Sequence, residues 1–265
     1  MQYFDTHAHY EDSRFAEEYT GGADELLKTL FAENVCGVIN TATSLQNIPS
    51  VIAQAQKFPK MYTALGIHPC DAQAIDEPID QVMAFLKEKL TDPASKAVAL
   101  GEIGLDYHYD DTDKEKQLAY FHAQMQLAES LDLPVVIHDR EAHADVYDVI
   151  FKYPAVRGVL HSFSGSAEDA LKLVQRGYMI SFSGVLTFKN ARKTVECANI
   201  LPKESVLIET DCPYLAPVPH RGKLNHSGML VYTNATLAQC LGISESECAS
   251  LTAENACRFF SIKNS

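Results

Sequence analysis

The sequence has few basic residues and no long apolar run. Its 265 residues include 22 lysines and arginines against 35 aspartates and glutamates, a formal net charge of −13. This balance argues against a wide basic groove for duplex nucleic acid, whereas a nucleic acid held at one point through bound metal is compatible with it. No apolar stretch approaches the roughly 18–20 residues that a membrane span needs, so no membrane partner is expected.

The seven cysteines do not form a recognisable framework. They are odd in number and include no Cys-x-x-Cys pair, which argues against structural disulfides and a zinc ribbon. Five lie among apolar residues and are expected to fill the core: Cys36, Cys197, Cys240, Cys248 and Cys257. The opening MQYFDTHAHY lacks the basic and apolar regions of a signal peptide, so a cytoplasmic protein is expected. The protein is also expected to be a monomer.

Eight short runs have the character of β-strands, and segments with helical apolar spacing separate them. The runs cover residues 3–6, 35–40, 61–66, 97–103, 134–138, 158–161, 178–181 and 205–209. Two of them, AVALGEIG and VVIH, are continuously apolar, which favours parallel strands buried on both faces. This alternation predicts an α/β fold, a (β/α)8 TIM barrel, with a doubly wound open sheet as the rival.

The end of the chain is predicted to be helical. Helices are expected over residues 231–241, 244–251 with a serine N-cap, and 253–260. A length of 265 residues permits one or two domains. Because no linker or low-complexity stretch interrupts the pattern, we expect residues 1–265 to form one barrel domain with additional C-terminal helices.

Residues able to bind metal fall at the ends of the expected strands. The parallel strands of a barrel open at one mouth, and there these side chains are expected to converge. His7 and His9 lie two positions apart and so share a face of the first strand. The six candidates are His7, His9, Glu102, His138, His161 and Asp211.

The chemistry of these six side chains limits which metals can bind. Histidines and carboxylates without thiolates suit Zn, Mn, Fe, Co or Ni, and Mg less well. Glu102 is central in strand order, so its carboxylate is placed to bridge two cations. Two divalent cations can clamp the oxygens of a phosphoryl displacement and lower the pKa of a bound water. The alternative, polar residues that only satisfy one another, is disfavoured by the cost of burying carboxylates.

Several longer motifs resemble the TatD-like metal-dependent deoxyribonuclease family of the amidohydrolase superfamily. They are DTHAH at 5–9, GIHP at 66–69, GEIGLDY at 101–107, LPVVIHDR at 133–140, GVLHSFSGS at 158–166, ISFSGVLTFKNA at 180–191, ETDCPYLAPVPHRGKLN at 209–225 and TAENACRFF at 252–260. The resemblance covers nearly the whole chain. It implies a (β/α)8 barrel with a divalent-metal centre and hydrolysis of DNA phosphodiesters, commonly as a 3′–5′ exonuclease on single strands.

The resemblance also assigns roles to residues. It implies one metal on His7, His9, Glu102 and Asp211, and a second on Glu102, His138 and His161, with Asp211 as general base. Glutamate at position 102, where many amidohydrolases have a carboxylated lysine, argues against a phosphotriesterase-like or dihydroorotase-like member. The segment Leu224-Asn225-His226-Ser227 departs from the family's Arg-Asn-Glu-Pro, which is expected to alter a loop at the mouth.

Donors for phosphate and a surface for bases are expected around the mouth. His68, Arg221 and Lys189 follow three of the expected strands, and Arg221 can bind phosphate through two N–H groups. His68 can orient a phosphate or protonate a leaving oxygen, or it can stiffen the Gly-Ile-His-Pro turn. Tyr107 can stack on a base or pack in the wall.

Three functions are compatible with these patterns. The leading hypothesis is a two-metal phosphodiesterase that acts on single-stranded DNA or DNA ends with a short footprint. The second keeps the metal centre but hydrolyses another ester or an amide. The third is a barrel that binds metal without catalysis.

Overall fold

The computed structural model describes residues 1–263, and its eight strands form a barrel. The strands are β1 (Tyr3–Ala8), β2 (Val35–Thr41), β3 (Met61–Ala64), β4 (Ala97–Asp106), β5 (Val135–Arg140), β6 (Gly158–Leu160), β7 (Met179–Phe182) and β8 (Val206–Ile208). Each strand pairs in parallel with the next, in the order β1 to β8. At the seam, the His9 amide donates to the Cys212 carbonyl at 2.8 Å and the Asp211 amide to the His7 carbonyl at 2.9 Å. The predicted (β/α)8 barrel is confirmed, and the open doubly wound sheet is excluded.

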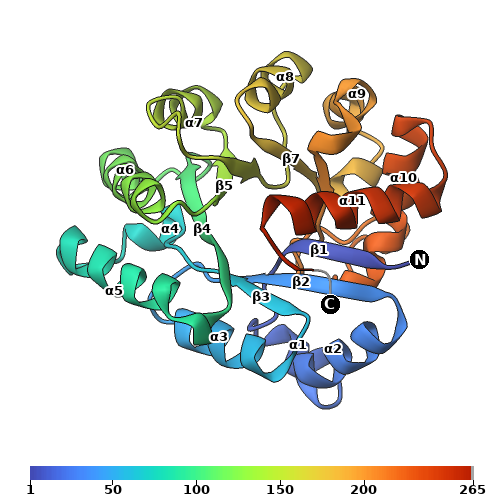
Figure 1. Cartoon of the computed structure of the whole chain (residues 1–265), viewed down its shortest axis with the longest axis horizontal. Helices are drawn as coiled ribbons and strands as arrows, with labels where there is room; N and C mark the ends of the chain where they lie inside the picture. The colour runs from blue at the N-terminus through green and yellow to red at the C-terminus, as the bar shows by residue number, and fades with distance from the viewer. Residues whose placement is uncertain (264–265) are drawn as a thin grey trace.

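The helices surround the strands (Figure 1). They are α1 (Arg14–Glu18), α2 (Gly22–Glu33), α3 (Ile48–Lys57), α4 (Pro69–Ala72), α5 (Ile79–Thr91), α6 (Lys114–Leu131), α7 (His143–Ile150), α8 (Ala167–Gln175), α9 (Arg192–Ile200), α10 (Leu230–Leu241) and α11 (Glu245–Phe259). None of the helices among the described residues is long and apolar enough to cross a membrane.

The interior of the barrel contains one apolar layer to which every strand contributes. Its members are Phe4, Ile39, Ala64, Ala99, Val136, Val159, Met179 and Leu207. Phe259 and Phe260 at the end of α11 pack against this layer. Arg157, which lies just before β6, donates to the Phe259 carbonyl at 2.8 Å. Helix α11 therefore closes the end of the barrel where the strands begin, and the opposite end is left for a site.

The C-terminal helices differ from the prediction in one respect. The segments 244–251 and 253–260 form the single helix α11 rather than two. The hydroxyl of Thr252, at the expected break, donates to the Cys248 carbonyl inside the helix at 3.0 Å, so no turn interrupts it. The predicted cap is confirmed: Ser244 and Glu247 form a reciprocal capping box.

The cysteines follow the prediction in part. All seven are free, and Cys197 and Cys248 are buried in the core. Cys36, Cys240 and Cys257 are only half-buried, since each lies at the margin of an apolar cluster rather than inside it.

Candidate metal centre

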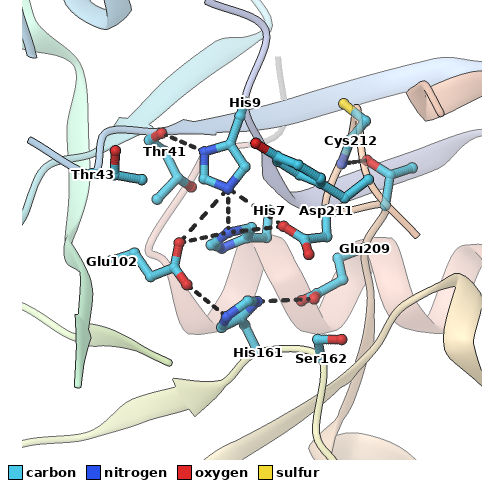
Figure 2. Close-up of polar contacts among 12 residues, drawn as sticks. His7, His9, Thr41, Thr43, Glu102, His161, Ser162, Glu209, Asp211 and Cys212 are labelled. Carbon is cyan, nitrogen blue, oxygen red and sulfur yellow. Dashed lines mark hydrogen bonds and ion pairs between the residues drawn. The ribbon is translucent and has the colours of Figure 1, made fainter. Parts of the chain in front are cut away.

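All six predicted ligands meet at the mouth formed by the carboxyl ends of the strands. Figure 2 shows five of them, with Glu102 between the imidazoles of His9 and His161. His7 and His9 come from the end of β1, Glu102 and His138 lie in β4 and β5, and His161 follows β6 directly. Asp211 comes three residues after β8.

The first group contains His7, His9 and Asp211 around one oxygen of Glu102. The Nε2 atoms of His7 and His9 are 3.0 Å apart. Glu102 Oε2 lies 3.3 Å from His7 Nε2 and 3.7 Å from His9 Nε2. Asp211 Oδ1 is 3.6 Å from the first ring nitrogen and 3.4 Å from the second. Four potential ligand atoms thus converge.

The second group uses the other oxygen of Glu102. Glu102 Oε1 lies 2.7 Å from His138 Nδ1 and 2.8 Å from His161 Nε2. These two ring nitrogens are 3.3 Å apart. Glu102 is therefore shared, with Oε2 facing the first group and Oε1 facing the second.

Acceptors outside the cluster fix the orientation of three histidine rings. His9 Nδ1 contacts the Thr41 carbonyl at 2.9 Å, His138 Nε2 contacts Asp106 at 3.0 Å, and His161 Nδ1 contacts Glu209 at 3.2 Å. A carbonyl or carboxylate accepts a proton from the nitrogen it touches, so the other ring nitrogen can present a lone pair to a cation that displaces its proton. This arrangement is typical of histidines that ligate metals.

The buried charges shift the pKa values of the cluster. Burial alone would raise the pKa of Glu102, but His161, His7 and His68 hold it well below its usual value. Burial works to lower the pKa of His9, yet Asp211, Glu11 and Glu102 raise it to about 10. The carboxylates therefore require positive charge beside them.

Divalent cations fit this site better than protons alone. The four histidine rings crowd nitrogens against one another, and protonating them places like charges 3.0–3.3 Å apart. Among residues 1–263, the buried atoms His7 Nδ1 and Glu209 Oε2 have no hydrogen-bond partner. Imidazoles and carboxylates are ligands for Zn, Mn, Fe, Co and Ni. Groups of three close ligand atoms occur on both sides of Glu102.

His68 lies in the same cluster, on the second side. Its Nδ1 accepts the Cys70 amide proton at 3.1 Å and so caps the short helix α4. Its Nε2 is 3.7 Å from Glu102 Oε1. Burial, and then the neighbouring His138, lower its pKa to about 3, so the ring is neutral and its proton sits on Nε2. The structure bears out that His68 stiffens its turn, and it directs the other ring nitrogen toward the site. Its contact with a phosphate or a leaving oxygen stays a prediction.

The structure also places the three other predicted substrate contacts. Arg221 and Lys189 are exposed in the loops after β8 and β7, and the Arg221 guanidinium lies 3.8 Å from the centre of the Phe188 ring. Tyr107 is half-buried, donates its hydroxyl to Asp145 at 2.8 Å, and has the Lys114 ammonium 4.0 Å from its ring centre. No polar contact joins these three side chains to the six candidate ligands among the contacts of the described residues. Their roles stay predictions.

Asp106 and Glu209 were absent from the sequence prediction. Asp106 follows Glu102 by four positions in β4, so period-2 alternation could have placed it on the same face. The intervening Gly104 has φ +140°, and a Cβ there would come within 2.0 Å of the His138 carbonyl oxygen, so glycine permits β4 and β5 to approach. Glu209 stands two positions before Asp211 in the ETD motif. The Thr41 carbonyl belongs to the backbone and carries no sequence signal.

The atypical segment 224–227 is partly buried, and two of its residues hydrogen-bond to β1 and to the loop after β8. Ser227 is buried and donates to Asp5 at 2.6 Å, and Asp5 also accepts from the Thr210 hydroxyl at 2.6 Å. Asn225 donates to the carbonyls of Thr210 and Tyr214 at 2.9 and 2.7 Å. The segment therefore holds the loop that carries Asp211.

Comparisons with known proteins agree with this geometry. The model of the family described as TatD related DNase matches residues 4–261. The chain is 37% identical over 261 residues to YabD of Bacillus subtilis, described as an uncharacterized metal-dependent hydrolase, and the alignment covers 98% of this chain and 99% of YabD. YcfH of Escherichia coli, described in the same words, is 34% identical over 97% of this chain and 95% of its own. The crystal structure of YjjV, a TatD homolog from E. coli, superposes with a TM-score of 0.89 at 30% identity and covers 98% of both chains.

Proposed function

The chain belongs to the TatD-related DNase family of metal-dependent hydrolases, and we propose that it hydrolyses the phosphodiester bonds of DNA with two divalent cations. The observation that carries the proposal is the position of Glu102. Its two carboxylate oxygens face two different groups of histidines, at 3.3 Å from His7 and at 2.7 Å from His138. A carboxylate shared between two sets of ligands can hold two cations close together, as two-metal phosphoryl-transfer sites do.

In this proposal each metal has its own residues. His7, His9, Glu102 and Asp211 hold the first cation, and Glu102, His138 and His161 hold the second. The cations, when bound, supply Lewis-acid stabilisation of the phosphate and a water of lowered pKa.

Asp211 is proposed as the general base. Its pKa is lowered, because the hydrogen bond from His9 and the neighbouring His7 outweigh the effect of burial, so it is ionised at neutral pH. The residue has φ +57°, a left-handed conformation stabilised by the turn in which the Tyr214 amide donates to the Asp211 carbonyl at 2.9 Å. The loop thereby points the carboxylate at the cluster, where it can accept the proton of the attacking water.

His68 and Arg221 are proposed to bind the phosphate. The Nε2–H of a neutral His68 can donate to a phosphate oxygen or to the departing oxygen. Neutrality is the appropriate state, because a charged imidazolium would compete with the cations. Arg221 supplies two parallel N–H donors from the loop that carries Asp211.

Single-stranded DNA or DNA ends are the proposed substrate, with digestion in the 3′–5′ direction. The net charge of −13 opposes the approach of long duplex DNA. Attraction to phosphate would be confined to the mouth, and a short footprint follows.

Metal analysis combined with product mapping tests the proposal. The purified protein is analysed for metal content, treated with EDTA, and reloaded with Mg, Mn, Zn, Ni or Co. Each form is then incubated with 3′- and 5′-labelled single-stranded and duplex DNA and with a panel of carboxylic esters, lactones and amides. Metal-dependent shortening from the 3′ end is the expected result. Hydrolysis of the panel but of no nucleic acid would overturn it.

A further inference from the structure

Two tyrosine rings on the rim of the mouth are exposed. Among the described residues, the large hydrophobic side chains that are exposed are Met1, Tyr109, Ile200, Tyr214 and Val218. Tyr109 is 50% exposed and Tyr214 is 49% exposed. Tyr109 lies in the loop after β4, and Tyr214 lies in the loop after β8, so both belong to the end of the barrel that holds the candidate metal centre.

An arginine lies over each ring. The Arg14 guanidinium is 4.3 Å from the centre of Tyr214, and the Arg140 guanidinium is 5.6 Å from the centre of Tyr109. Asp12 holds Arg14 in place through two hydrogen bonds of 2.9 and 2.8 Å. A cation over an aromatic face stabilises the ring's position and adds local positive charge. The charge of Arg14 is balanced by Asp12, so on a protein with a net charge of −13 it is Arg140 that brings positive charge to the rim.

Tyr214 stands directly beside the candidate metal centre. Its ring centre is 6.5 Å from that of His9, in an edge-to-face arrangement. The ring forms one wall of a cavity of about 270 Å³, whose other lining residues are His9, Glu11, Asp12, Thr43 and Asn47. A nucleotide whose phosphate contacts the cluster could therefore place its base against this wall.

The two tyrosines stand on opposite sides of the mouth. The eight strands follow one another in order around the barrel, so β4 and β8 are diametrically opposed. The six candidate ligands lie between the loops that follow these strands. A single strand that crosses the mouth from one tyrosine to the other would pass over the cluster.

We propose that Tyr214 and Tyr109 are two base-stacking platforms that hold single-stranded DNA on either side of the phosphate to be cleaved. This inference rests on the proposed function and specifies its substrate. Base stacking on an aromatic ring tolerates any sequence, because every base has a π-face. Bases paired in a duplex are already stacked on their neighbours, so the two platforms select single strands and frayed ends.

Tyr109 suits this role better than Tyr107. The hydroxyl of Tyr107 donates to Asp145 at 2.8 Å, which fixes its ring in the wall. Tyr107 is half-buried, whereas half of Tyr109 is open to solvent. Tyr107 packs in the wall, where it can support the loop that carries Tyr109.

Binding to a phosphorothioate single strand, which resists hydrolysis, tests the two platforms. Fluorescence anisotropy measures Kd for the metal-loaded wild type and for Tyr214→Leu, Tyr214→Phe, Tyr109→Leu and Tyr109→Phe. Leucine keeps the apolar bulk without a π-face, and phenylalanine keeps the ring. Ile200→Ala is the matched control, because Ile200 is also exposed but lies on α9. Each leucine variant is expected to raise Kd on the order of tenfold, and the phenylalanine and control variants to stay within about twofold.

The second part of the test changes the DNA instead of the protein, with a strand in which one nucleotide lacks its base. In the wild type, removing the base that stacks on Tyr214 is expected to weaken binding about as much as Tyr214→Leu does, and the combination is expected to weaken it no further. Leucine variants that bind as tightly as the wild type, or losses that simply add, would overturn the inference while leaving DNA hydrolysis intact. Absence of metal-dependent DNA hydrolysis by the wild type itself would overturn the proposed function, and this is read without any variant.

Discussion

The carboxylate of Asp106 contacts Nε2 of His138 at 3.0 Å, on the side of the ring that faces away from Glu102. This contact fixes the ring so that Nδ1 points at Glu102 Oε1, 2.7 Å away. Carboxylates behind ligating histidines set the orientation and basicity of the ring. Asp106 is thus expected to control the second group without being a ligand itself.

The variant Asp106→Ala is expected to lower the affinity for Mn²⁺ by about 10–100-fold, because His138 loses the partner that orients it. A calorimetric titration of the metal-free protein with Mn²⁺ measures the change in affinity. Asp106→Asn is the control, since its amide oxygen can still accept from Nε2–H. A variant that binds Mn²⁺ like the wild type would show that His138 needs no such partner.

Asp211→Asn is expected to reduce kcat by about 10²–10⁴-fold, because the change removes the proposed proton acceptor. DNA binding is expected to change much less. Arg221→Ala, in contrast, is expected chiefly to raise KM, since Arg221 is proposed to contact the phosphate outside the cluster. Steady-state kinetics on a labelled single strand separates the two effects. Equal effects of both variants on KM would contradict the assigned roles.

Most of the candidate site could be predicted from the sequence, because the strands of a barrel all end at one face. His7, His9, His138 and His161 followed from strand ends alone. Asp106 and Glu209 did not, because a carboxylate near a strand end is also common on the solvent side of a loop. The pairing of Asp106 with His138 depends on how β4 and β5 lie against each other at Gly104. That register cannot be read from either segment alone.

The fold, like the site, could be predicted from the sequence only in part. Helical spacing locates α11 but predicts two helices, over 244–251 and 253–260, where the structure has one. Thr252 has low helix propensity, and its back-bonded hydroxyl to the Cys248 carbonyl becomes evident only in three dimensions. The exposed rings of Tyr109 and Tyr214 were equally hidden, because exposure depends on the loops that surround them.

Metal binding is expected to release protons and to weaken as the pH falls. In the metal-free protein the pKa of His9 is raised to about 10, and the pKa of His161 is raised well above its usual value because Glu102 and Glu209 outweigh burial. Both rings are therefore protonated at neutral pH, and a cation must displace these protons to reach the nitrogens. Lower pH favours the protonated rings, so the apparent affinity falls.

Calorimetric titration in buffers of different ionisation enthalpy measures this proton release. The observed enthalpy of Mn²⁺ binding should vary linearly with the buffer's ionisation enthalpy. The slope should have the sign expected when protons pass from the protein to the buffer. An enthalpy independent of the buffer would contradict the charge state inferred for His9 and His161.

Phe259→Ala is expected to destabilise the protein without affecting the chemistry. Phe259 is 7% exposed and packs on the apolar layer at the closed end of the barrel, with Phe4 and Leu207 in the same cluster. Truncation leaves a cavity that α11 cannot fill, at a cost of about 3–5 kcal/mol in the free energy of unfolding. Urea denaturation followed by circular dichroism measures the loss, and Phe259→Leu should show less than half of it. Because the barrel interior separates Phe259 from the mouth, kcat of the folded variant should equal that of the wild type. A lower kcat in the fully folded variant would contradict this, because it would mean that α11 influences the site through the barrel.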